Sequence, residues 1–228
     1  MTAGEALHLQ LLRMDAAHLR RNVRRLELTR TISLSQLMDR RHELDKELPD
    51  GEQTLKDIRD KGEVTFDLPH WWFDSDYPGH FLRQIKTISV SLPMLVGPYQ
   101  DVRAVLTQVS SKTVLKADKL AMNFLYNKGE EKDPRNIRIN PRASQSIGLS
   151  SGLDDHGLFM LDFNDERYLP FEGTGALSTW ELKFPRHDKS PQEEMLKSLN
   201  DVIIHVRYSA VDGGPTFAGE VSDLLDKP

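Results

Sequence analysis

Apolar residues near the start of the chain recur at helical spacing. Leu12, Ala16, Leu19, Val23 and Leu26 follow one another at alternating separations of four and three residues, which places them on one side of a helix. Arginines occupy much of the remaining circumference, so this helix would be half apolar and half cationic. Because an isolated helix is marginal in water, the pattern predicts that it packs against a neighbouring element or a neighbouring subunit.

Two shorter helices are predicted next. The step Thr31-Ile32-Ser33 offers a capping residue before a second helix, which ends near Pro49-Asp50-Gly51. A third helix, from about Glu52 to Lys61, would stop at Gly62, because glycine often ends a helix.

From Glu63 onward the pattern alternates between apolar and polar residues, as in a half-buried strand. Ile88, Val90 and Leu92 alternate with polar residues up to Pro93, which ends that strand. Further strand candidates are residues 101–109, 144–149, 158–163, 177–184 and 202–208. Many short strands without long intervening helices predict a mainly β protein with a helical N-terminal segment. The expected fold is an antiparallel, jelly-roll-like β-sandwich preceded by two or three helices.

The expected domain organisation follows from this change of pattern. Residues 1–65 form a helical segment, 66–215 the sandwich, and 216–228 a tail. Within the tail, Val221, Leu224 and Leu225 are expected to dock as one turn of helix at most.

Composition and charge narrow the function classes. The chain has 228 residues, no cysteine and a formal net charge of -5, so disulfides and cysteine-based metal sites are excluded. Residues 1–30 carry six arginines against three acidic residues, or +3, which leaves -8 for the rest. We favour a solvated helix face over a basic docking stripe as the reason for this asymmetry. The mild overall acidity argues against a nucleic-acid-binding domain.

The sequence shows no targeting or membrane segment. Apolar residues never run uninterrupted for the roughly 18 positions of a membrane helix. The start Met1-Thr2-Ala3-Gly4-Glu5 has an acid where a signal peptide would carry basic residues. These features predict a soluble protein without a signal peptide in this chain.

One motif looks catalytic but has the wrong context. Gly148-Leu149-Ser150-Ser151-Gly152 matches a G-x-S-x-G nucleophile elbow, with Asp154 and His156 after it. The elbow needs a strand-to-helix turn, whereas a turn and then the strand Leu158 to Phe163 are predicted here. We therefore interpret the motif as a β-turn of small residues.

The candidate metal and cofactor motifs are incomplete. Asp74-Ser75-Asp76 resembles the start of a calcium loop, but Pro78 and Ile85 occupy ligand positions of that loop. Gly173-Thr174-Gly175 lacks the third glycine of a dinucleotide fingerprint. The histidines show no local metal-binding spacing; they are at positions 8, 18, 42, 70, 80, 156, 187 and 205. We expect no cofactor and no metal.

Two other residue groups carry weaker functional hypotheses. Asp162, Glu166 and Glu172 could supply a carboxylate pair like that of a glycosidase. Trp71-Trp72-Phe73, if on a strand, would point to opposite faces, so core packing plus an interface contact is favoured over a sugar platform.

Several segments between residues 66 and 215 together form a family pattern. They are Phe73-Asp74-Ser75-Asp76-Tyr77-Pro78-Gly79-His80 with Arg83-Gln84-Ile85-Lys86, Val96-Gly97-Pro98-Tyr99, Leu149-Ser150-Ser151-Gly152, Asp165-Glu166-Arg167-Tyr168-Leu169-Pro170-Phe171-Glu172-Gly173, and Asp201-Val202-Ile203-Ile204-His205 followed by Asp212-Gly213-Gly214. In this order they resemble the C-terminal region of the A subunit of bacterial Tc insecticidal toxin complexes. The helix before Ile32-Ser33-Leu34 is similar to the end of that family's channel-forming segment. Residues 40–61 and 110–140 match the pattern less well.

The resemblance implies a non-enzymatic role without catalytic residues. In that family the A subunit is a homopentamer that forms a translocation channel. Its C-terminal β-domain binds TcB, the B component of the B-C cocoon, at the channel entrance. The implied setting is a secreted virulence complex, with self-association through the N-terminal helix, no nucleic acid and no membrane contact by this part of the chain.

The family pattern also marks candidate structural or docking residues. These are Asp76, Tyr77, Pro78, Gly79, His80, Gly97, Pro98, Tyr99, Glu166, Arg167, Tyr168, Pro170, Phe171, Glu172 and Gly173. The alternative hypothesis is a carbohydrate-binding sandwich that would use Trp71, Trp72 or Tyr168 as stacking faces, and a hydrolase that uses Ser150 or the acidic cluster comes third.

Overall fold

The computed structural model describes residues 13–14, 24–95, 102–129, 131–140, 145–149, 158–160 and 171–225. In chain order the elements are β1 (Leu26–Ser33), α2 (Leu34–Leu44), α3 (Gly51–Lys61), β2 (Glu63–Leu68), α4 (His70–Asp74), β3 (His80–Pro93), β4 (Ala104–Val114), α5 (Lys119–Tyr126), β5 (Ile137–Asn140), β6 (Gln145–Leu149), β7 (Leu158–Met160), β8 (Leu177–Lys183), α6 (Gln192–Lys197), β9 (Ile203–Asp212) and α7 (Gly214–Leu225). Within these residues, no helix has the length and apolar character to cross a membrane.

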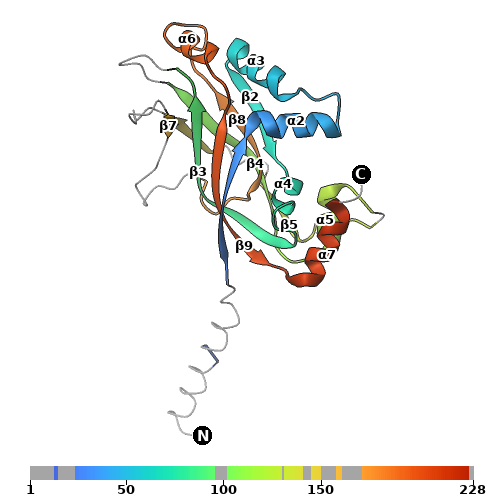
Figure 1. Cartoon of the computed structure of the whole chain (residues 1–228). Helices are drawn as coiled ribbons and strands as arrows, with labels where there is room; N and C mark the ends of the chain where they lie inside the picture. The colour runs from blue at the N-terminus through green and yellow to red at the C-terminus, as the bar shows by residue number, and fades with distance from the viewer. Residues whose placement is uncertain are drawn as a thin grey trace, which may run out of the picture.

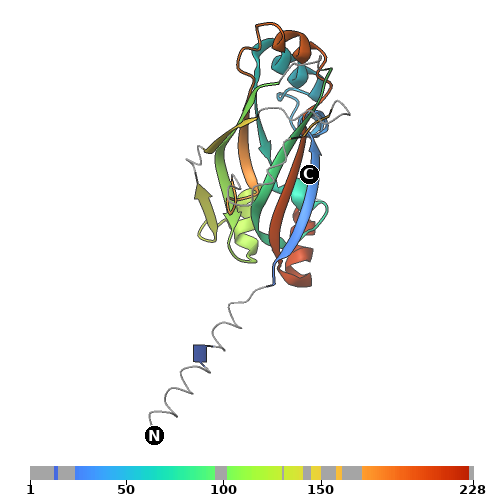
Figure 2. The ribbon, with the colours of Figure 1, turned by 90° about the vertical axis from the view of Figure 1, so that its left-hand side faces the viewer.

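The strands form two antiparallel sheets that lie face to face (Figure 1; Figure 2). One sheet has the order β1-β9-β3-β7, and the other has the order β2-β8-β4-β5 with β6 also paired to β4. Alternate side chains of both sheets enter one buried cluster, whose largest members include Phe66, Trp180 and Tyr208. The predicted mainly β, antiparallel sandwich is confirmed.

Strand β1 replaces the end of the predicted N-terminal helix. Leu26 was expected to be the last apolar position of that helix, but it begins β1 and pairs with Ala210 of β9. The β-branched residues Thr29, Thr31 and Ile32 favour an extended chain, and pairing along β9 decides the conformation. Residues 26–33 therefore share a sheet with residues from beyond position 65. Most of the predicted helix lies outside the described residues.

The two short predicted helices are confirmed as α2 and α3. The Ser33 hydroxyl accepts a hydrogen bond from the Gln36 amide and caps α2. Asp50 caps α3 in the same way, and α3 ends at Gly62, which adopts the left-handed conformation with φ 69°.

The C-terminal residues form a longer helix than expected. Only one docked turn was predicted in the tail, whereas α7 covers Gly214–Leu225 and buries Phe217, Val221 and Leu224. The spacing of these residues by three and four places them on one face, which packs beside α4 and α5.

The remaining helices divide between the two ends of the sandwich. β1 begins beside Ala210 and ends at Ser33, opposite Ile203. Helices α3 and α6 lie beyond that second end, whereas α5 and α7 lie toward the end where β1 begins (Figure 1). We call α3, α6, residues 93–95 and residues 184–191 the α3–α6 end.

Candidate docking site and its bracing network

The described family-pattern residues fall into two segments that meet on strand β3. The first is Asp76 to His80, between α4 and β3, and the second is Phe171 to Gly173, before β8. The others lie outside the described residues; these are Gly97, Pro98, Tyr99, Glu166, Arg167, Tyr168 and Pro170. The structure brings the two described segments together through backbone and side-chain contacts of residues 83–86.

A bulge in β3 makes this meeting possible. The pairing of β3 with β9 shifts between Phe81 and Gln84, and Leu82 has a φ of 50°. A bulge turns a side chain out of the regular alternation. Here it lets the Arg83 side chain reach back to α4, while its backbone carbonyl accepts a hydrogen bond from the Ala176 amide at 3.1 Å.

Arg83 lies at the centre of a buried polar network. Its Nη2 donates to Asp74 Oδ1 at 2.7 Å and to the Tyr77 carbonyl oxygen at 3.0 Å. The Tyr126 hydroxyl donates to the other carboxylate oxygen of Asp74 at 2.9 Å. Burial raises the pKa of Asp74, against the opposing effect of Arg83. The network ties α4, β3 and α5 together.

The turn from Asp76 to His80 is fixed on both sides. Asp76 Oδ2 lies 3.0 Å from Arg30 Nη1 of β1, and the ring of Tyr77 stacks on that of His80 with centroids 5.3 Å apart. Gly79 has a φ of 82°, and a β-carbon there would lie 2.6 Å from the Cα of Ala218 in α7. Glycine is therefore required at this close approach.

The second segment is held against the same strand. Phe171 adopts a φ of 68° and packs edge-on against Trp180 with ring centroids 4.8 Å apart. The Ile85 amide donates to the Thr174 carbonyl at 2.8 Å, and the Gly173 amide donates to the Ile85 carbonyl at 2.9 Å. The turn thus pairs with β3 of one sheet and leads into β8 of the other.

Only part of the family pattern reaches the surface. Asp76, Tyr77, Glu172 and Gly173 are exposed, whereas Gly79 and Phe171 are buried. Glu172 Oε1 lies 3.6 Å from Lys86 Nζ, and both side chains are exposed to solvent. The buried members brace the sandwich, and only the exposed ones are accessible to a partner.

The tryptophans of the alternative hypothesis lie on a helix, so the expectation of opposite faces, which applies to a strand, does not hold for them. Trp71 and Trp72 belong to α4, a short helix that follows Pro69. The Arg40 guanidinium lies 5.3 Å from the Trp71 ring centroid, and that of Arg30 lies 4.6 Å from the Trp72 centroid. One face of each ring is therefore occupied by a cation. Tyr168 lies outside the described residues.

The structure also places the other chemical candidates. Asp74, the first residue of the calcium-like run, is fully buried and bonded to Arg83 and Tyr126. Within the part of the chain that the structure describes, no group of His, Asp and Glu could hold a metal. Gly148 and Leu149 end β6, but Ser150, Asp154 and His156 lie outside the described residues, as do Asp162 and Glu166.

The roles of Asp74, Arg83 and Tyr126 are not evident from the sequence. In the sequence, Asp74 resembles the first residue of a calcium loop, and Arg83 appears only within the family pattern. The sequence feature that indicates their pairing is that an acidic and a basic residue, Asp74 and Arg83, flank the turn from Asp76 to His80 and follow aromatic residues. Tyr126 gave no signal, because its contact depends on the packing of α5.

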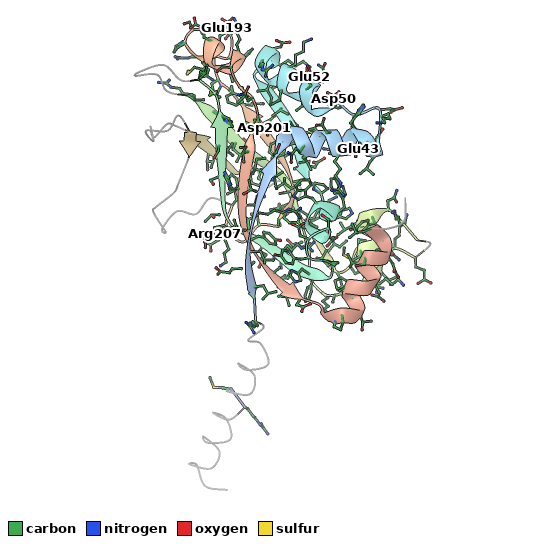
Figure 3. The ribbon with its side chains drawn as sticks, viewed as in Figure 1. Glu43, Asp50, Glu52, Glu193, Asp201 and Arg207 are labelled. Atoms are coloured by element: carbon green, nitrogen blue, oxygen red, sulfur yellow. The ribbon has the colours of Figure 1, made fainter. Side chains whose placement is uncertain are left out.

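The α3–α6 end presents the other accessible features. Leu95, at the end of β3, is 81% exposed, yet its amide donates to the Ser198 hydroxyl at 2.9 Å. The Asn200 amide also donates to the Pro93 carbonyl at 3.0 Å. Acidic side chains lie on both helices of this end; Glu52 of α3 and Glu193 of α6 are labelled in Figure 3.

Comparisons with known proteins agree with the sequence pattern. A protein-family model described as "Tc toxin complex TcA C-terminal TcB-binding domain" matches residues 1–210. Toxin subunit YenA2 of Yersinia entomophaga is 41% identical over 225 residues, which are 99% of this chain and 16% of that protein.

A solved structure shares the fold. The cryo-EM structure of Yersinia pseudotuberculosis TcaA-TcaB is 30% identical, with 92% of this chain and 11% of that chain covered and a TM-score of 0.54. The chain thus spans a small fraction of the length of both relatives. Because the family model covers most of the chain, the resemblance is confirmed, and the chain belongs to the family of TcA C-terminal TcB-binding domains of Tc toxin complexes.

Proposed function

We propose that this domain is a non-enzymatic docking module that binds the TcB component of a Tc toxin complex. The observation that carries the proposal is the match of residues 1–210 to the TcB-binding domain family. The bracing network supports it, because the buried Asp74–Arg83 ion pair and the close approach at Gly79 hold the elements of the sandwich together, so that it can present a fixed surface.

The α3–α6 end is the surface that we assign to docking. The family is described as the C-terminal domain of TcA, so the rest of such a subunit would join through the segment before β1. β1 begins at the opposite end of the sandwich from α3 and α6 (Figure 2). The α3–α6 end therefore faces away from the remainder of the subunit and is open to a partner.

Leu95 is the best anchor at this end. Because its backbone is already fixed, burial of Leu95 by a partner would order only the side chain. The hydrogen bonds from the amides of Leu95 and Asn200 hold this segment against α6. We expect Leu95 to enter an apolar depression on TcB.

The wider assembly follows as part of the same proposal. Several copies would form a ring through contacts that include residues 1–30, in a secreted toxin complex with a translocation channel, and the α3–α6 ends would together form a composite docking surface. A ring of this kind requires large, self-complementary contacts. Light scattering with and without residues 1–24, a deletion that keeps all of β1, tests this part separately from TcB binding.

The docking test compares two exposed apolar residues. Leu95→Glu should weaken binding to purified TcB by roughly tenfold or more, because it places a charge in an apolar contact. Ile139→Glu is the matched control, since Ile139 is 47% exposed on β5, away from the α3–α6 end. If both variants weakened TcB binding equally, or if neither weakened it, the assignment of docking to the α3–α6 end would be wrong.

A further inference from the structure

A small, largely enclosed cavity lies beneath the turn from Asp76 to His80. His70, His80, Arg83, Thr113 and Leu125 are among the residues that line it, so it is bounded by α4, β3, β4 and α5. The volume open to the centre of a water molecule is about 10 Å³. A space of this size holds about one water molecule, provided that polar groups face it.

Two buried nitrogen atoms on its lining residues have no partner within the described part of the chain. They are Arg83 Nε and His80 Nδ1. Arg83 is only 4% exposed, and its hydrogen bonds to Asp74 and Tyr77 both use Nη2. A buried donor without an acceptor costs about 1–3 kcal/mol, so a partner for Nε is strongly favoured.

The chemistry of the two atoms is complementary. Arg83 Nε–H is always a donor, whereas Nδ1 of a neutral histidine accepts when the proton is on Nε2. Burial, together with the charge of Arg83, lowers the pKa of His80, which favours the neutral ring at neutral pH. Stacking on Tyr77, with the two ring planes 1° apart, fixes the orientation of the imidazole.

We propose that this cavity binds one ordered water molecule, which accepts a hydrogen bond from Arg83 Nε–H and donates one to His80 Nδ1. The water completes the hydrogen bonding of Arg83, whose other contacts join α4 to β3. His80 is then a positioning residue that acts on Arg83 through this water. The histidine of the family pattern thus acquires an internal role rather than one in partner contact.

A high-resolution crystal structure of the unmodified chain tests the proposal directly. The expected result is ordered solvent within about 3.2 Å of both Arg83 Nε and His80 Nδ1. A direct hydrogen bond between these two atoms, or a cavity whose solvent contacts neither of them, would overturn it.

Nuclear magnetic resonance of the folded protein gives a second readout. A long-lived water should produce a cross-peak between the water signal and the Arg83 Nε–H proton. His80→Asn keeps an acceptor near the position of Nδ1 and should retain the cross-peak, whereas His80→Leu should lose it. Persistence of the cross-peak in His80→Leu at the strength of the unmodified protein would refute the role of His80.

Discussion

Arg83 Nη2 lies 2.7 Å from Asp74 Oδ1, and the two side chains are 5% and 0% exposed. The Arg83 guanidinium also contacts the Tyr77 carbonyl of the first family segment, and its backbone carbonyl accepts a hydrogen bond from the Ala176 amide, three residues after the second segment. Several residues of the family pattern, such as Asp74 and Arg83, therefore stabilise the sandwich.

Removal of the Asp74 carboxylate should be strongly destabilising. Asp74→Ala leaves the Arg83 guanidinium buried without its counter-charge, which costs about 3–5 kcal/mol of the free energy of unfolding. Urea denaturation measures this loss. Lys197→Ala, which breaks the exposed pair with Glu193, is the control and should change stability little. If both variants lost a similar free energy of unfolding, the buried pair would stabilise the fold no more than the exposed pair does.

Two glycines with the same backbone conformation should respond differently to alanine. Gly173→Ala, with φ 77° and open space around the new β-carbon, should lose only the left-handed penalty of about 1–2 kcal/mol. Gly79→Ala adds a contact of 2.6 Å with the backbone of α7. Overpacking of this kind costs about 1–3 kcal/mol more. Thermal unfolding of the two variants should therefore rank Gly79→Ala as clearly the less stable.

Stability should fall in mild acid because of His70. Burial lowers the pKa of His70 from 6.5 to about 3. Between these values the unfolded chain binds a proton that the folded chain does not, so the free energy of unfolding decreases as pH falls, by about 1.4 kcal/mol per pH unit at most. Denaturation at a series of pH values from 7 to 4 measures this slope.

The variant His70→Phe isolates this contribution. Phenylalanine keeps an aromatic ring against Tyr126, whose ring centroid lies 4.0 Å from that of His70. The raised pKa of Asp74 acts in the opposite direction, since the folded state then binds the extra proton, but it is common to both proteins. The variant should therefore lose stability less steeply in acid. Parallel pH profiles would contradict the assignment to His70.

The sequence predicted elements whose signals are local. Ser33, Asp50 and Gly62 mark the ends of α2 and α3 because a cap depends on the residues next to it. The alternation of Ile88, Val90 and Leu92 likewise identified β3, because one of its faces is buried. These local preferences match the folded structure because the tertiary contacts favour the same helices and strands.

The structure could not be predicted from the sequence where contacts between distant residues decide it. Leu26 fits a helical stripe as well as a strand, and only its pairing with β9 selects the strand. The role of Arg83 depends on a bulge that carries no clear sequence signal. The family pattern located the relevant segments, but it did not separate Gly79, which is buried against α7, from exposed Tyr77.

Equilibrium binding of the purified chain to purified TcB tests the central claim most directly. The account predicts saturable binding of the unmodified chain, with affinity reduced by Leu95→Glu and kept by Ile139→Glu. Absence of saturable binding by the correctly folded chain would contradict the docking function.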